Sequence, residues 1–136
     1  MALKSKCYCI NLRRAALAVT KHYDCALKST GLSANQFSLL INLSRMKSAS
    51  VSKLAIQVGL ERTTLVRTLK PLLSRRLVSD TSAQTERDRK LEVTQEGWRV
   101  IEIALPRWEQ AQKELENRLG AENISVFLHL LGKLTN

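Results

Sequence analysis

The chain has 136 residues, of which 44% are apolar and 25% charged, and only five are glycine and two proline. One domain of this length can bury an adequate core without disulfide bonds, and the composition excludes collagen-like, low-complexity and disordered proteins. The formal net charge is +10, and residues 45–94 hold eleven bases and five acids, whereas residues 95–136 hold five bases and six acids. A basic region on a small domain indicates a polyanionic partner, most often a nucleic acid.

The sequence contains no run of about 18 apolar residues and no apolar signal segment at its start, so we expect a cytoplasmic protein with no membrane partner. Its cysteines are Cys7, Cys9 and Cys25, and an odd number argues against a disulfide framework. Even with His22 as a fourth ligand, the Cys-x-Cys and His-x-x-Cys spacings match no common zinc site. We therefore expect neither a metal nor another cofactor.

Apolar residues spaced three and four apart predict a first helix over residues 8–29. Gly31 is a typical helix stop signal. The sequence Ser33-Ala-Asn-Gln36 is a capping box, which predicts a second helix over about residues 34–46.

Next come two helices joined by a tight turn. Ser50 is expected to cap a third helix over about residues 51–58, which Gly59 ends. Glu61 is expected to cap a fourth helix, from Arg62 to about residue 76.

The rest of the chain reads as a hairpin followed by two helices. Residues 77–81 and 91–94 are strand candidates, and the polar, charged link between them predicts a long loop with a basic tip. Residues 95–119 form a long amphipathic pattern, and a last helix is expected over about residues 121–134. The expected fold class is mostly α with a small β-hairpin.

The spacing between the third and fourth helices is informative. Ala55 is small where two helices would cross, Gly59 follows four residues later and accepts a left-handed turn, and apolar Leu65 comes six residues after that. This spacing predicts a helix-turn-helix, and the adjoining basic hairpin makes it a winged one. The alternative is a plain pair of antiparallel helices with a solvated polar face. Such a pair would share the turn but would not need the basic β-hairpin that follows.

The outward positions of the fourth helix carry donors and hydroxyls suited to base edges and phosphates in a major groove. The hairpin can place a cation in the narrow minor groove, where the potential is most negative. The candidate DNA contacts are Ser50, Lys53, Arg62, Thr63, Thr64, Arg67, Lys70, Arg87, Arg89 and Lys90.

Segments along nearly the whole chain carry a family resemblance. They include Leu12-Arg-Arg-Ala-Ala, Leu60-Glu-Arg-Thr-Thr-Leu-Val-Arg-Thr-Leu69 and Val93-Thr-Gln-Glu-Gly97, together with residues 31–40, 70–73, 76–78, 88–90 and 104–112. In this order and spacing, they resemble the MarR family of dimeric, winged helix-turn-helix transcriptional regulators.

The resemblance implies an intertwined α-helical homodimer that binds double-stranded DNA as a repressor. Residues 1–31 and 97–136 would form the dimerisation helices of one compact domain, and residues 32–96 the DNA-binding region. The two recognition helices would lie one helical turn apart, about 34–36 Å, on a pseudo-palindromic operator. The broad apolar faces of the first and last helices favour a dimer independently, because one small core does not need them.

The hairpin departs from the family pattern. The family usually places Asp-Arg-Arg about eight or nine residues before the threonine that closes the hairpin, whereas Asp88 lies six residues before Thr94. Either the hairpin is shorter or Glu86 takes the acidic role. Which arginine enters the minor groove therefore stays open.

The resemblance also implies release from DNA by a small-molecule or oxidant effector. A pocket between helices is one site for such a ligand, and the alternative is that the same aromatic residues are core. The residues of this candidate pocket are Tyr23, Phe37, Trp98 and Trp108.

An oxidant would act on a cysteine. Cys9 and Tyr23 keep the fourteen-residue spacing of the organic-hydroperoxide-sensing branch of the family, whose second tyrosine corresponds to Ala34. A sensor thiol needs a helix N-terminus or a nearby cation to favour the thiolate, and Arg13 is close in sequence. Cys7 is a candidate resolving thiol.

Plainer interpretations remain for the cysteines and for the function. Cys9 can instead be a small buried residue, and Cys25 is expected to be one. An enzyme is not expected, because His22 and His129 lie in separate helices and no glycine-rich phosphate loop occurs. An RNA-binding or ribosome-associated winged helix, or a protein–protein adaptor, would share the basic hairpin.

Overall fold

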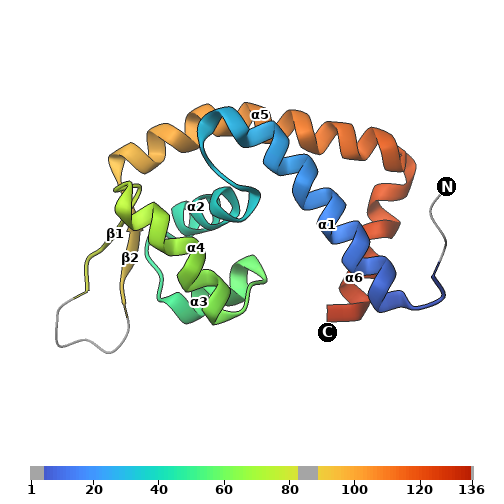
Figure 1. Ribbon diagram of the computed structural model, residues 1–136, viewed down its shortest axis with the longest axis horizontal. Coiled ribbons are helices and arrows are strands. Elements are labelled where there is room, and N and C mark those ends of the chain that lie inside the picture. Colours follow the sequence, from blue (N-terminus) through green and yellow to red (C-terminus); the bar gives the residue numbers. More distant parts are fainter. Residues whose placement is uncertain (1–4, 83–88, 136) are drawn as a thin grey trace.

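The computed structural model describes residues 5–82 and 89–135 and confirms a mostly α fold with one antiparallel hairpin (Figure 1). The elements in chain order are α1 (Tyr8–Leu27), η1 (Lys28–Thr30), α2 (Ala34–Met46), α3 (Val51–Val58), α4 (Arg62–Ser74), β1 (Val78–Asp80), β2 (Leu91–Val93), α5 (Gln95–Leu119), η2 (Ala121–Asn123) and α6 (Ile124–Thr135).

Local capping explains where several helices begin. The Ser33 hydroxyl accepts a hydrogen bond from the Gln36 amide at 3.1 Å, and the Gln36 side chain accepts one from the Ser33 amide at 2.9 Å. This capping box is the predicted one. Ser50 caps α3 through the Lys53 amide at 3.2 Å, as expected. Thr94 caps α5 through the Gly97 amide at 3.0 Å.

Some predicted boundaries were wrong. The first helix ends at Leu27, because the chain tightens into the 3₁₀ turn Lys28–Thr30 before Gly31. The fourth helix ends at Ser74, and Arg76 has a φ of 58°. The last helix begins after the 3₁₀ turn Ala121–Asn123.

The expected cap on the fourth helix was also wrong. Glu61 occupies the N-cap position of α4, but its side chain makes no capping hydrogen bond. Effective caps are short side chains such as Ser, Thr, Asp and Asn, and a glutamate is longer than these.

The hairpin is short and tied to the helical core. Each strand has three residues, in the register Val78↔Val93, and not the longer runs expected. Ala49, which precedes α3, exchanges backbone hydrogen bonds of 3.1 and 2.9 Å with Leu91. The loop end of strand β2 is therefore fixed relative to α3.

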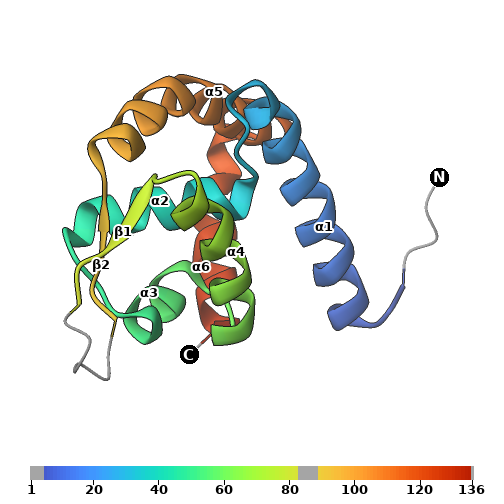
Figure 2. The ribbon, with the colours of Figure 1, turned by 60° about the vertical axis from the view of Figure 1, so that its left-hand side comes forward.

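One hydrophobic core joins α2, α3, α4, the hairpin and the middle of α5. Figures 1 and 2 show α5 arching over α2, with α3 and α4 beneath. The largest fully buried side chains are all leucines: Leu27, Leu39, Leu40, Leu43, Leu54, Leu65, Leu69, Leu72, Leu77 and Leu91.

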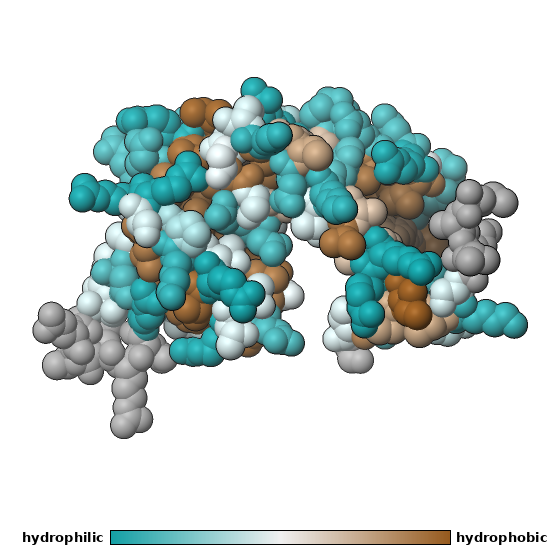
Figure 3. Space-filling view, viewed as in Figure 1, coloured by the Kyte–Doolittle hydropathy of each residue, from teal (hydrophilic) through white to brown (hydrophobic). Residues whose placement is uncertain are grey.

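The first part of α1 and the whole of α6 lie outside this core. Helix α6 buries none of its residues, and Leu128 and Leu134 are 61% and 68% exposed. In Figure 2 the N-terminal end of α1 stands apart from α2–α4, and Figure 3 shows apolar surface over the end of the molecule that α1 and α6 form. Among the described residues, no helix is long and apolar enough to cross a membrane.

Candidate nucleic-acid interface

Helices α3 and α4 form the predicted helix-turn-helix. Gly59 ends α3 with a φ of 72°, a left-handed conformation that glycine adopts at little cost. The Leu60 amide donates to the Ala55 carbonyl at 3.0 Å, which closes the turn. Ala55 and Leu65 are buried where the two helices meet. The spacing of Ala55, Gly59 and Leu65 therefore predicted the helix-turn-helix correctly.

Helix α4 has one apolar and one polar face. Leu65, Leu69 and Leu72 are fully buried and fix the rotation of the helix. Thr64 and Thr68 are half-buried, and the Thr68 hydroxyl donates to the Thr64 carbonyl at 2.9 Å, inside the helix. The candidate residues that α4 leaves exposed are Arg62, Thr63, Arg67 and Lys70.

The first helix of the motif contributes to the same surface. Lys53 is exposed, whereas the Ser50 hydroxyl is occupied as the cap of α3. The Arg62 guanidinium donates from Nη1 to the Ser52 hydroxyl at 2.5 Å, across the two helices. Sequence reasoning missed Ser52, because no local pattern predicts a hydrogen bond to an arginine ten residues later in the next helix.

The hairpin and its loop, residues 78–93, form the wing. Lys90 is exposed beside the strand, and Arg89 is half-buried in an ion pair with Asp80 at the loop end of the two strands. The two predicted DNA contacts therefore differ in availability, because Arg89 is paired with Asp80 and Lys90 is exposed. Arg87, Glu86 and Asp88 lie outside the described residues.

Three of the four aromatic residues of the candidate pocket come together. The ring centroids of Tyr23 and Phe37 each lie 6.1 Å from that of Trp108. The Tyr23 hydroxyl donates to the Gln112 side chain, and burial raises the pKa of Tyr23. Trp98 is not part of this group: it is 47% exposed, about 15 Å before Trp108 along α5.

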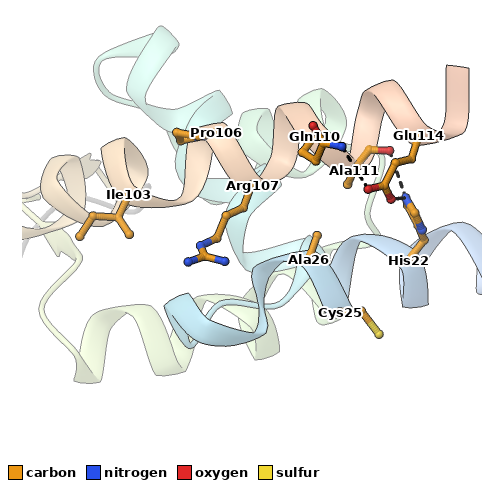
Figure 4. Close-up of a pocket in the computed structure, with 9 residues that line it drawn as sticks. All are labelled: His22, Cys25, Ala26, Ile103, Pro106, Arg107, Gln110, Ala111 and Glu114. Carbon is orange, nitrogen blue, oxygen red and sulfur yellow. Dashed lines mark hydrogen bonds and ion pairs between the residues drawn. The ribbon is translucent and has the colours of Figure 1, made fainter. Parts of the chain in front are cut away.

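Two cavities lie between α5 and other helices. A cavity of about 150 Å³ between α2 and α5 is lined by Phe37 and Trp108 among others. A larger one, about 660 Å³, lies between α1 and α5 (Figure 4). The residues that line the larger cavity are His22, Cys25, Ala26, Ile103, Pro106, Arg107, Gln110, Ala111 and Glu114.

The α1–α5 cavity is polar at one end and carries a guanidinium near its middle. Nε2 of His22 lies 3.0 Å from the Ala111 carbonyl oxygen and 3.3 Å from the Glu114 carboxylate, which links the two helices (Figure 4). Arg107 has no hydrogen bond or ion pair to any residue that the structure describes. Sequence reasoning did not find this cavity, because its walls come from helices about eighty residues apart.

The cysteines are all exposed, so the interpretation of Cys9 and Cys25 as buried packing residues was wrong. Cys25 lines the α1–α5 cavity and is still exposed. Nη2 of Arg13 lies 3.4 Å from the Cys9 sulfur and donates to it. Cys9 and Tyr23 both lie in α1, about 21 Å apart along the helix, so they do not meet within one protomer.

Comparison with known proteins agrees with this geometry. The model of the MarR family matches residues 32–90, and no curated protein sequence matches the chain. The structure of the transcriptional regulator MosR of M. tuberculosis in complex with DNA is 32% identical, covers 96% of each chain and has a TM-score of 0.82. The chain belongs to the MarR family. It is a DNA-binding transcriptional regulator with a winged-helix fold.

Other solved structures share the MarR-type fold at lower identity. The transcriptional repressor CouR, bound to a 23-mer DNA duplex, is 24% identical over the whole of both chains, with a TM-score of 0.85. BpsR of Bordetella bronchiseptica, whose DNA binding is regulated by 6-hydroxynicotinic acid, is 21% identical over 92% of this chain and 96% of its own, with a TM-score of 0.83.

Proposed function

We propose that this MarR-family protein is a homodimeric repressor that binds a pseudo-palindromic operator in double-stranded DNA. Helix α4 enters the major groove and the wing reaches the flanking minor groove. The observation that carries the proposal is the polar face of α4, where Arg62, Arg67 and Lys70 are exposed opposite three fully buried leucines. A rigid helix that presents donors in this way suits the acceptors of base edges and phosphates.

The exposed apolar faces support the dimer. Residues 1–31 and 97–136 hold α1, the greater part of α5 and α6, and α6 exposes Val126, Leu128 and Leu130 to solvent. A second copy of the chain would remove this surface from water, and a two-fold axis between the copies would require an operator with inverted half-sites.

Selection of binding sites from a library of random-sequence duplexes tests the proposal. The recovered duplexes should contain an inverted repeat with half-sites about one helical turn apart, bound by two chains, with affinity that falls steeply as salt rises. A promoter that overlaps the selected site should lose transcription when the protein is added. A monomeric protein, or one that prefers structured RNA to every duplex, would contradict it.

Within this function, we propose that a small aromatic carboxylate is the effector, bound in the α1–α5 cavity. Its volume of about 660 Å³ suits a small molecule. The Arg107 guanidinium can donate hydrogen bonds to a carboxylate, while Ile103 and Pro106 supply apolar wall. Regulation of BpsR by 6-hydroxynicotinic acid is a precedent in the same fold. The ligand would release DNA if it binds the DNA-free arrangement of the helices better.

A panel of aromatic carboxylates that includes 6-hydroxynicotinic acid tests this part. An active compound should lower affinity for the selected duplex in the wild type and lose its effect in Arg107→Gln. The control is Arg118→Gln, which removes a cation outside the cavity and should leave the response intact. If Arg107→Gln responds like the wild type, the cavity is not the effector site.

Thiol oxidation is a second route to release, favoured by the contact between Arg13 and the Cys9 sulfur at 3.4 Å. The sulfur of Cys9 would attack an organic hydroperoxide, forming a sulfenic acid and releasing an alcohol. The Cys7 thiol could then condense with it to a disulfide, releasing water.

Cumene hydroperoxide is a suitable oxidant for this route. It should release DNA from the wild type and from Cys25→Ser, but not from Cys9→Ser. If all three proteins respond alike, or none responds, Cys9 is not a sensor.

A further inference from the structure

The two arginines on the exposed face of α4 are held differently. Arg62, the first residue of α4, donates to the Ser52 hydroxyl on α3 at 2.5 Å. Arg67 lies five residues further along and makes no hydrogen bond or ion pair with any part of the chain that the structure describes. One guanidinium is thus oriented by the protein itself and the other is not.

We infer that Ser52 is a positioning residue that directs Arg62 to a DNA phosphate, leaving Arg67 to read a base edge. The inference rests on the proposed function, because it assigns separate roles within that DNA interface. In a helix-turn-helix the first helix crosses the sugar-phosphate backbone while the second enters the major groove. Ser52 lies on the first of these helices, at its second residue. A guanidinium tethered there lies on the backbone side of the interface.

The chemistry of the pair suits a phosphate. A guanidinium has five N–H donors in a planar fork, so the bond to Ser52 leaves others for phosphate oxygens. The serine hydroxyl accepts from Arg62 with a lone pair and so holds the guanidinium in one orientation. An arginine that is already ordered in the free protein also loses less side-chain entropy on binding.

The assignment predicts different effects of the two arginines on specificity. Phosphate contacts orient a protein on DNA but carry no direct sequence information, whereas base contacts discriminate between sequences. Arg62→Ala should therefore weaken binding to a selected duplex and to its scrambled version by the same factor. It should also lower the slope of log affinity against log salt by about 0.9. Arg67→Ala should lower the ratio of the two affinities by about 5- to 150-fold.

Ser52 is tested through its dependence on Arg62. Ser52→Ala should weaken binding to both duplexes about two- to tenfold, and Ser52→Thr, which keeps the hydroxyl, should restore it. In the Arg62→Ala background, Ser52→Ala should have no further effect, as a double-mutant cycle would show. Because Ser52 is exposed, the thermal midpoint of Ser52→Ala should equal that of the wild type.

Several outcomes would overturn the assignment. Arg62 reads bases if Arg62→Ala changes the ratio of affinities, and Ser52 does not act through Arg62 if its substitution costs the same in both backgrounds. Failure to select an inverted repeat would reject the proposed operator only, since scrambled duplexes still test Arg62 and Ser52. A wild-type protein that binds no duplex would reject both the proposed operator and the roles assigned to Ser52 and Arg62.

Discussion

Nε of Arg89 lies 2.8 Å from Oδ2 of Asp80, and this ion pair joins the two sides of the wing where the strands give way to the loop. The other carboxylate oxygen of Asp80 accepts hydrogen bonds from the Ser82 amide at 3.0 Å and the Ser82 hydroxyl at 2.6 Å. The hydrogen bond from Arg89, and then those from Ser82, lower the pKa of Asp80 to about 2. Part of the positive charge of the wing is therefore used to hold its own shape, while Lys90 remains exposed.

The Asp80 carboxylate should titrate abnormally, and Arg89 should be the reason. Its pKa of about 2 is below the ordinary 3.8, so Asp80 stabilises the folded state above about pH 4 and loses this contribution as pH falls toward 2. Carboxyl NMR should show the value rising toward 3.8 in Arg89→Gln. Arg99→Gln, which breaks the separate pair with Glu96, should leave it unchanged. An unaltered Asp80 titration in Arg89→Gln would contradict this account.

Gly97 should tolerate no side chain. A Cβ there would press on the Leu77 carbonyl oxygen and lie 2.7 Å from Val93 Cγ1, so Gly97→Ala should lower the free energy of unfolding by about 1–3 kcal/mol. Gly132 in α6 has nothing within 4 Å of such an atom, and Gly132→Ala should raise stability by up to about 1 kcal/mol. Urea denaturation of both variants measures these values. If Gly97→Ala and Gly132→Ala change the free energy of unfolding by the same amount and in the same direction, the contacts around Gly97 can relax to admit a side chain.

A charge on the apolar face of α6 should break the proposed dimer. Phe127 is 40% exposed in the single chain, and Phe127→Asp would place a carboxylate in the surface that a second copy would cover. Analytical ultracentrifugation should find monomers, with weakened binding to the selected duplex. Ser125→Glu, on the polar side of the same helix, should remain dimeric. A dimeric Phe127→Asp protein would place the interface elsewhere.

The two N-caps of α2 and α4 should differ in energetic value. Ser33 makes both hydrogen bonds of a capping box, so Ser33→Ala should cost about 0.5–2 kcal/mol of stability. Glu61 makes no capping hydrogen bond. Glu61→Ala should therefore cost only its interaction with the helix dipole, about 0.3–1 kcal/mol. Thermal or urea denaturation tests the difference. Similar losses at both positions would show that Glu61 caps α4 in solution.

Much of the fold could be predicted because its signals are local. The capping box at Ser33, the left-handed turn at Gly59 and the leucine spacing of α4 act through residues within one or two helical turns. They therefore determined the bounds of α2 and α3, and the helix-turn-helix with its polar face. Errors occurred at helix ends, where weak preferences compete: Glu61 has no capping bond, and the chain tightens into 3₁₀ turns at Lys28 and Ala121.

By itself, the sequence determined a basic, mostly helical winged-helix chain, because helix periodicity, caps and charge distribution are properties of neighbouring residues. Only the tertiary structure decided which side chains meet across distant segments. It placed Trp98 away from the Tyr23–Trp108 stack, lined a cavity with His22 and Arg107, and tied Arg62 to Ser52. These contacts depend on how helices cross and rotate, which the packing of the whole leucine core sets and no local pattern encodes.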